Sequence, residues 1–135
     1  MDEPRWLWRA IVDAVHRELV EEHGGLYGVR DAGMIESALA RPLNRWSYEG
    51  AGADLADLAA AYGFALARNH GYLDGNKRIA LAAMHVFAWI NGHEIAAEEP
   101  DEVATMLDVA SGVLGEADLA AWLRVRLSPR DPSEQ

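Results

Sequence analysis

Length, composition and charge exclude several classes of protein. The chain has 135 residues, enough for one domain, and contains no cysteine, which excludes thiol catalysis, thiolate metal sites and a disulfide framework. Its formal charge is −10 and its single lysine stands among scattered arginines, so we expect no direct nucleic-acid partner, because nucleic-acid binders neutralise phosphates with clustered basic residues.

The start of the chain shows no targeting signal. Residues 1–6 lack the basic region and the long apolar run of a signal peptide. Elsewhere no apolar run approaches the roughly 20 residues that a membrane span needs. The sequence therefore predicts a cytoplasmic protein with no membrane partner.

The first third of the chain predicts two helices and a loop. Apolar residues at three- and four-residue steps predict a helix over residues 4–22, with Pro4 in its opening turn. Asp31 is a good N-cap for a short helix to about residue 40, because Pro42 should bar its continuation. Residues 42–53 show no helical period and end near two glycines, which predicts a loop or a small hairpin.

Two apolar helices are predicted at the centre of the chain. The first covers residues 55–69 and opens with Asp54 and Asp57, which resemble a capping box. The second starts near Asn76 and ends before Asn91-Gly92. Between the two apolar segments lies a polar nonapeptide, residues 70–78, with the sequence His-Gly-Tyr-Leu-Asp-Gly-Asn-Lys-Arg.

The last third predicts two more helices and a tail. A short extended piece is expected around Ile95, a helix from Pro100-Asp101, and a last helix over about residues 116–127. We expect one domain over residues 1–127 and a flexible polar tail over residues 128–135. The fold class is all-α, a compact bundle of about six helices with a small loop or hairpin before the central pair.

The nonapeptide has the residues of a phosphate-transfer site. If Asn76 begins a helix, free amides and the helix dipole favour an anion there, Lys77 and Arg78 add positive charge, and Gly75 leaves the approach open. A carboxylate at Asp74 suits this place if Mg²⁺ lies between it and the phosphate.

A proton acceptor completes the set. The imidazole of His70 could take a proton from an attacking hydroxyl. The simpler alternative is a turn in which these side chains only bond the backbone or solvent. Elsewhere, His16 and His23 are seven residues apart and could share a helix face as metal ligands, but no third ligand is evident.

This stretch resembles the motif of the Fic/Doc family, His-x-Phe-x-(Asp/Glu)-Gly-Asn-(Gly/Lys)-Arg. Five residues match it directly, Tyr72 takes the Phe place, and Lys77 is the residue of the death-on-curing (Doc) branch. Residues 28–42 also look like the Doc-type segment that precedes the active-site flap. Gly71 and Ile79 depart from the commoner Pro and Thr of the family.

The resemblance implies a Fic/Doc-type fold and a role for each residue. His70 would be the general base, Asp74 the Mg²⁺ ligand, and Gly75, Asn76, Lys77 and Arg78 the residues that bind the phosphates of ATP and complete the catalytic set. The predicted loop over residues 42–53 would be the active-site flap, and it would dock the backbone of the target protein by strand addition. Its expected residues are Asn44, Arg45, Trp46, Ser47 and Tyr48.

Lys77 favours one of two reactions known in the family. Most Fic proteins transfer AMP to a hydroxyl, whereas the Doc branch is a kinase-like toxin that phosphorylates a threonine of translation elongation factor Tu and blocks translation. Where adenylyltransferases have glycine, a lysine should crowd the α-phosphate, so phosphate transfer is the first hypothesis. The first alternative is AMP transfer. The second alternative is a Fic-fold binding module without catalysis.

The resemblance also implies an antitoxin. The family is restrained by a Ser/Thr-x-x-x-Glu helix in the same chain or in a partner, and no Ser or Thr of this chain has Glu four residues later. Inhibition within the chain is therefore not expected. A separate antitoxin protein, with a helix in a groove beside the site, is the expected partner.

Overall fold

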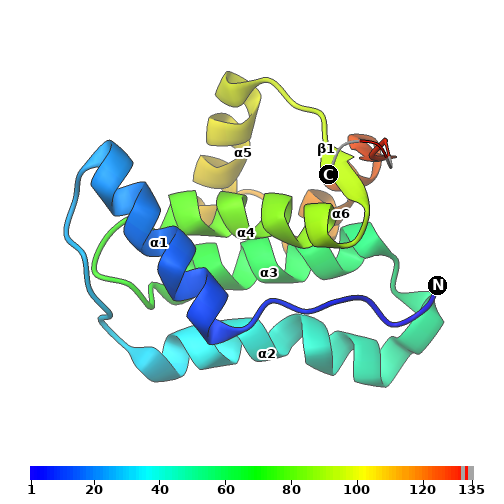
Figure 1. Ribbon diagram of the computed structural model, residues 1–135, viewed down its shortest axis with the longest axis horizontal. Coiled ribbons are helices and arrows are strands. Elements are labelled where there is room, and N and C mark those ends of the chain that lie inside the picture. Colours follow the sequence, from blue (N-terminus) through cyan, green and yellow to red (C-terminus); the bar gives the residue numbers. More distant parts are fainter. Residues whose placement is uncertain (132, 134–135) are drawn as a thin grey trace.

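The computed structural model describes residues 1–131 and 133, and within them the protein is a helical bundle (Figure 1). The all-α prediction is confirmed. The sheet has two short antiparallel strands, β1 and β2. The elements are α1 (Arg9–His23), α2 (Ala32–Glu49), the 3₁₀ turn η1 (Gly50–Gly52), α3 (Leu55–Asn69), α4 (Asn76–Ile90), β1 (His93–Ile95), α5 (Glu99–Ser111), α6 (Glu116–Arg124) and β2 (Leu127–Pro129).

Helix α3 is the centre of the bundle, with α2, α4 and α6 packed around it (Figure 1). Most of its residues are buried, as expected for a helix that is apolar on every side. Small residues allow the close packing: a Cβ at Gly63 would lie only 2.3 Å from the sulfur of Met84 in α4. The predicted ranges of α3 and α4 are confirmed.

The segment before α1 is extended, so the prediction that the first helix begins near Pro4 is wrong. Helix α1 begins at Arg9. Residues Trp6 and Leu7 are buried in the extended segment, and the Leu7 amide donates to the Tyr62 hydroxyl of α3 (2.9 Å). This contact replaces the helical bonds that the segment would otherwise make, and it spans 55 residues of sequence.

Helix α2 runs through Pro42 to Glu49, so the predicted loop or hairpin over residues 42–53 is also wrong. A proline inside a helix removes one hydrogen bond and costs about 3 kcal/mol. Here the apolar stripe continues past the proline, because Leu43 and Trp46 pack on the core after the buried Ala38 and Leu39. Burial of that stripe offsets the local cost.

The last helix ends earlier than predicted, and the short strand β2 follows it. The last helix ends at Arg124, and Ser128 and Pro129, predicted to lie in the tail, pair with Glu94 and His93 in the sheet. Residues 132, 134 and 135 of the predicted tail lie outside the described residues. Among the helices described, none combines the length and the apolarity that a bilayer crossing requires.

An ion-pair cluster joins α6 to the start of α3. Asp54 and Asp57 form the predicted capping box, each carboxylate accepting from the other residue's amide (2.8 and 3.1 Å). Arg124 donates to both carboxylates, at 2.7 Å to Asp54 and 2.9 Å to Asp57. Its guanidinium lowers the pKa of the Asp54 carboxyl to about 2.

This pKa predicts a pH-dependent contribution to stability. Because the pKa of Asp54 is lower in the folded protein, its stabilisation is complete above about pH 4 and is lost as the pH falls towards 2. Asp54→Asn keeps an N-capping side chain but removes the charge. Since half of the Asp54 side chain is exposed, we expect a loss of only about 0.2–1 kcal/mol at pH 6.

Urea unfolding of the wild type and of Asp54→Asn, from pH 6 to pH 2.5, measures the difference in their free energies of unfolding. Carboxyl groups outside the cluster of Asp54, Asp57 and Arg124 titrate equally in the two proteins, so their effects cancel, and the difference reports the cluster. The difference should shrink as the pH falls below about 4. A difference that does not vary with pH would contradict a role for the charge.

Candidate functional site

The candidate site is built on the loop between α3 and α4, and two left-handed residues give the loop its shape. His70 caps the end of α3 with φ of 50°, and Gly75 precedes α4 with φ of 73°. Left-handed backbone is the usual way to end a helix, and glycine adopts it at no cost. His70 is exposed, so a substrate can reach its side chain.

Residues 28–31 hold the first half of this loop. The Gly71 carbonyl accepts hydrogen bonds from the amides of Arg30 (2.9 Å) and Asp31 (3.0 Å), and the Leu73 amide donates to Gly28 (3.0 Å). The Arg30 side chain also donates to the carbonyl of His70 at 2.5 Å. The backbone of the proposed base is therefore held by the segment that leads into α2.

Two further side chains hold the middle of the loop. The Asn76 amide group brackets Tyr72, accepting from its N–H (3.1 Å) and donating to its carbonyl (3.0 Å). The Tyr72 hydroxyl donates to Asp13 of α1 (2.5 Å). Burial, together with this bond, raises the pKa of Tyr72, so the phenol stays protonated as a donor. The sequence offered two roles for the Asn76 side chain, a phosphate ligand or a turn residue that bonds the backbone, and the structure shows the backbone bonds.

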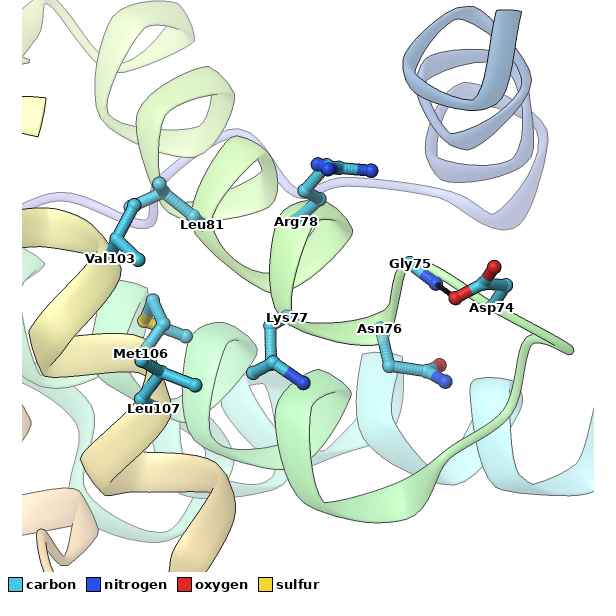
Figure 2. Close-up of a pocket in the computed structure, with 9 residues that line it drawn as sticks. All are labelled: Asp74, Gly75, Asn76, Lys77, Arg78, Leu81, Val103, Met106 and Leu107. Atoms are coloured by element: carbon cyan, nitrogen blue, oxygen red, sulfur yellow. Dashed lines mark hydrogen bonds between the residues drawn. The ribbon is translucent and has the colours of Figure 1, made fainter. Parts of the chain in front are cut away.

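The second half of the loop opens on a pocket of about 320 Å³ between α4 and α5 (Figure 2). One side of the pocket is polar and comes from the loop and the first turn of α4. The other side is apolar and comes mainly from α5. The lining residues are Asp74, Gly75, Asn76, Lys77, Arg78, Leu81, Val103, Met106 and Leu107.

The polar side of the pocket suits an anion. The first helical hydrogen bond of α4 joins the Ile79 amide to the Gly75 carbonyl (2.9 Å), so the amides of residues 76–78 have no acceptor within the helix. Lys77 and Arg78 are exposed and make no ion pair among the described residues. The lining thus combines three free amides with two cationic residues at the positive end of a helix dipole, and the side chains of Lys77 and Arg78 extend to different sides of the first turn of α4 (Figure 2).

Asp74 supplies the carboxylate of the pocket. One of its oxygens accepts from the Gly75 amide (2.9 Å) and the other from Leu26 at 3.4 Å, and the side chain is exposed. The described residues contain no cluster of three potential metal ligands. A single carboxylate does not suit a metal cage, but it suits Mg²⁺, which commonly takes one or two carboxylates and completes its shell with substrate phosphates and water.

The structure brings most of the predicted site residues together, but not the predicted flap. Asp74 to Arg78 line one pocket, whereas His70, four residues before them at the start of the same loop, is not among its lining residues. The five flap residues lie in the second half of α2, where Arg45 contacts Asp57 in the first turn of α3. Since His70 is at the other end of α3, roughly 20 Å away, the structure does not place them at the site. These residues are Asn44, Arg45, Trp46, Ser47 and Tyr48.

Sequence reasoning missed several residues that support the site. Arg30, Asp13 and His16 contact the loop from 40 to 59 positions away, and no local pattern links them to it. A weak signal exists for the apolar wall. Val103 and Leu107 lie at the spacing of a core-facing helix stripe, yet each is about half exposed, at 50% and 51%, because they face the pocket.

Comparison with known proteins places this geometry in a family. The family model described as "Fic/DOC family" matches residues 6–88. The matched range runs from the extended segment before α1 to near the end of α4, and it includes the whole loop of the candidate site. More than half of the chain is therefore covered.

Two curated relatives carry Doc names. The chain is 47% identical over 75 residues to "Toxin Doc" of Mycolicibacterium smegmatis, an alignment that covers 56% of this chain and 58% of that protein. It is 32% identical over 111 residues to "Protein kinase doc" of Escherichia phage P1, covering 82% of this chain and 86% of that protein.

Proposed function

The chain belongs to the Fic/DOC family, and from this premise we propose that it is the toxin of a toxin–antitoxin pair that phosphorylates a protein hydroxyl with ATP and Mg²⁺. The observation that carries the proposal is the pocket in which Asp74, Gly75 and the first turn of α4 meet. A carboxylate beside an amide-lined cationic pocket suits a phosphate with its Mg²⁺ better than it suits either alone.

Each residue has a part in this proposal. The amides of residues 76–78 with Lys77 and Arg78 bind and orient the phosphates, and the apolar wall of α5 excludes water from one side. Asp74 would hold Mg²⁺, which neutralises charge on the phosphates when bound. His70 takes the proton of the acceptor hydroxyl while its oxygen bonds to the γ-phosphorus of ATP; the bond from that phosphorus to the bridging oxygen breaks, and ADP leaves.

Lys77 supports phosphate transfer over AMP transfer. It lines the pocket at the start of α4, where Figure 2 shows its side chain beside Asn76. A side chain there takes the space that a glycine would leave for the α-phosphate and offers a cation to the end of the nucleotide. The relative from phage P1, which is named a protein kinase, supports the same choice.

The proposal includes partners. The acceptor is a threonine or serine hydroxyl, with elongation factor Tu in the cytoplasm as the candidate target, so that phosphorylation blocks translation. An antitoxin helix would cover the exposed apolar wall, where Val103 and Leu107 are about half exposed. The name of the relative from Mycolicibacterium smegmatis supports a toxin role.

ATP labelled separately at the α- and γ-phosphates tests the reaction. The purified protein is incubated with elongation factor Tu and with total cell protein as acceptors, and the label on protein is measured. We expect label only from the γ-position, and none when Mg²⁺ is removed with a chelator. Label that comes only from the α-position would replace phosphate transfer by AMP transfer.

A further inference from the structure

Beneath the loop of the candidate site lies a buried histidine that the proposed reaction does not use. His16 of α1 is 0% exposed. Its Nε2 lies 2.8 Å from the main-chain carbonyl oxygen of Asp74. The two residues are 58 positions apart in the sequence, so the contact exists only because α1 packs beside the loop.

The hydrogen bond sets the tautomer of the ring. A carbonyl oxygen can only accept, so Nε2 of His16 carries the hydrogen and donates. The other nitrogen, Nδ1, is buried and has no hydrogen-bond partner among the described residues. A buried polar atom without a partner is costly. An apolar side chain of similar shape would avoid that cost, but it could not donate to Asp74.

The same ring also lies close to the loop before and after Asp74. It stacks on Tyr72 with ring centroids 3.8 Å apart and planes 16° from parallel. On the other side, a Cβ added to Gly75 would lie 3.6 Å from Nε2. His16 therefore contacts the loop at Tyr72, at the Asp74 carbonyl and near Gly75.

We infer that His16 is a positioning residue that holds the Asp74–Gly75 turn, so that the Asp74 carboxylate and the first amides of α4 face the same phosphate. The inference rests on the proposed function for its catalytic part. Its structural part stands alone: the donor at Nε2 orders the loop, at the cost of an unpaired Nδ1. Residues that orient a metal ligand from behind commonly change metal affinity or activity 10- to 100-fold when they are replaced.

Two substitutions at this position separate the donor from the ring. His16→Phe keeps a flat ring against Tyr72, removes the unpaired nitrogen and removes the donor. His16→Gln loses the ring but can place an amide N–H near the position of Nε2. The matched control is His93→Phe, because His93 also bonds a main-chain carbonyl, that of Asn91 at 2.9 Å, but lies beyond the far end of α4.

Hydrogen exchange of the Leu73 amide, followed by NMR, reports the order of the loop without any substrate. That amide is bonded to Gly28 at 3.0 Å. In His16→Phe we expect the Leu73 amide to exchange about tenfold faster than in wild type, while the midpoint of urea unfolding is unchanged or raised. In His16→Gln and in His93→Phe we expect the exchange of this amide to stay close to wild type. Unchanged exchange in His16→Phe, or failure of that variant to fold, would overturn the inference.

The Mg²⁺ dependence of phosphate transfer tests the catalytic part of the inference. In His16→Phe we expect a 10- to 100-fold higher Mg²⁺ requirement for transfer and recovery of most of it in His16→Gln. Faster loop exchange with unchanged Mg²⁺ requirement would overturn the positioning role. If the wild-type protein transfers nothing from ATP, the proposed function fails by itself, and the exchange experiment still decides whether His16 orders the loop.

Discussion

Replacing His70 by asparagine is expected to lower the rate of phosphate transfer by about 10²- to 10⁴-fold, the usual contribution of a general base. Asparagine tolerates left-handed backbone better than most residues, so the cap of α3 at φ of 50° should persist. The carbonyl at this position still accepts from Arg30, because that bond involves only the main chain of residue 70. The substitution therefore removes the proton acceptor with little effect on the loop.

The measurement is single-turnover transfer of the γ-label, together with the affinity for nucleotide. Nucleotide affinity should stay within about twofold of wild type, because the pocket lining does not include His70. His23→Asn is the matched control, since His23 is an exposed histidine in the last turn of α1. Toxicity in cells that survives His70→Asn would favour a binding module without catalysis over an enzyme.

The two helices that carry the site could be predicted because their signals are local. Asp54 and Asp57 mark the start of α3 within four residues, and Gly75 marks the start of α4. The residues of the pocket's polar side are contiguous, so the motif alone brings them together. Caps and turns are decided by neighbours in the chain, and sequence patterns record them well.

The errors arose where distant contacts decide the local structure. The segment before α1 is extended because the Leu7 amide bonds Tyr62, 55 residues away. Helix α2 passes Pro42 because its apolar stripe packs on the core on both sides of the proline. In both cases the burial of apolar side chains against distant parts of the chain outweighs the local preference for or against helix. The same limit hid His16, whose sequence pattern suggested only an incomplete metal site.

Gly71→Ala is expected to lower the free energy of unfolding by about 1–3 kcal/mol and to reduce transfer as well. A Cβ at Gly71 would lie 2.4 Å from Cγ1 and 3.1 Å from the amide nitrogen of Ile35 in the first turn of α2. Ile35 is 1% exposed and cannot turn away. The loop must then shift, although the Gly71 carbonyl is bonded to Arg30 and Asp31.

A double-mutant cycle with Ile35→Ala tests this cause. Ile35→Ala alone should cost about 2–5 kcal/mol, because it leaves a cavity in the core. Combined with Gly71→Ala, the new methyl group enters that space, so the pair should be less destabilising than the sum by about 0.5–3 kcal/mol. Gly52→Ala is the control, since a Cβ there meets its nearest neighbour at 3.9 Å.

Urea unfolding of the four proteins gives the interaction energy directly. Additive effects would mean that the clash with Ile35 is not what makes glycine necessary at residue 71. If the double variant also regains transfer relative to Gly71→Ala, the loss of activity came from displacement of the loop. The position of His70 and Asp74 would then depend on how closely Gly71 packs against α2, which the motif alone does not reveal.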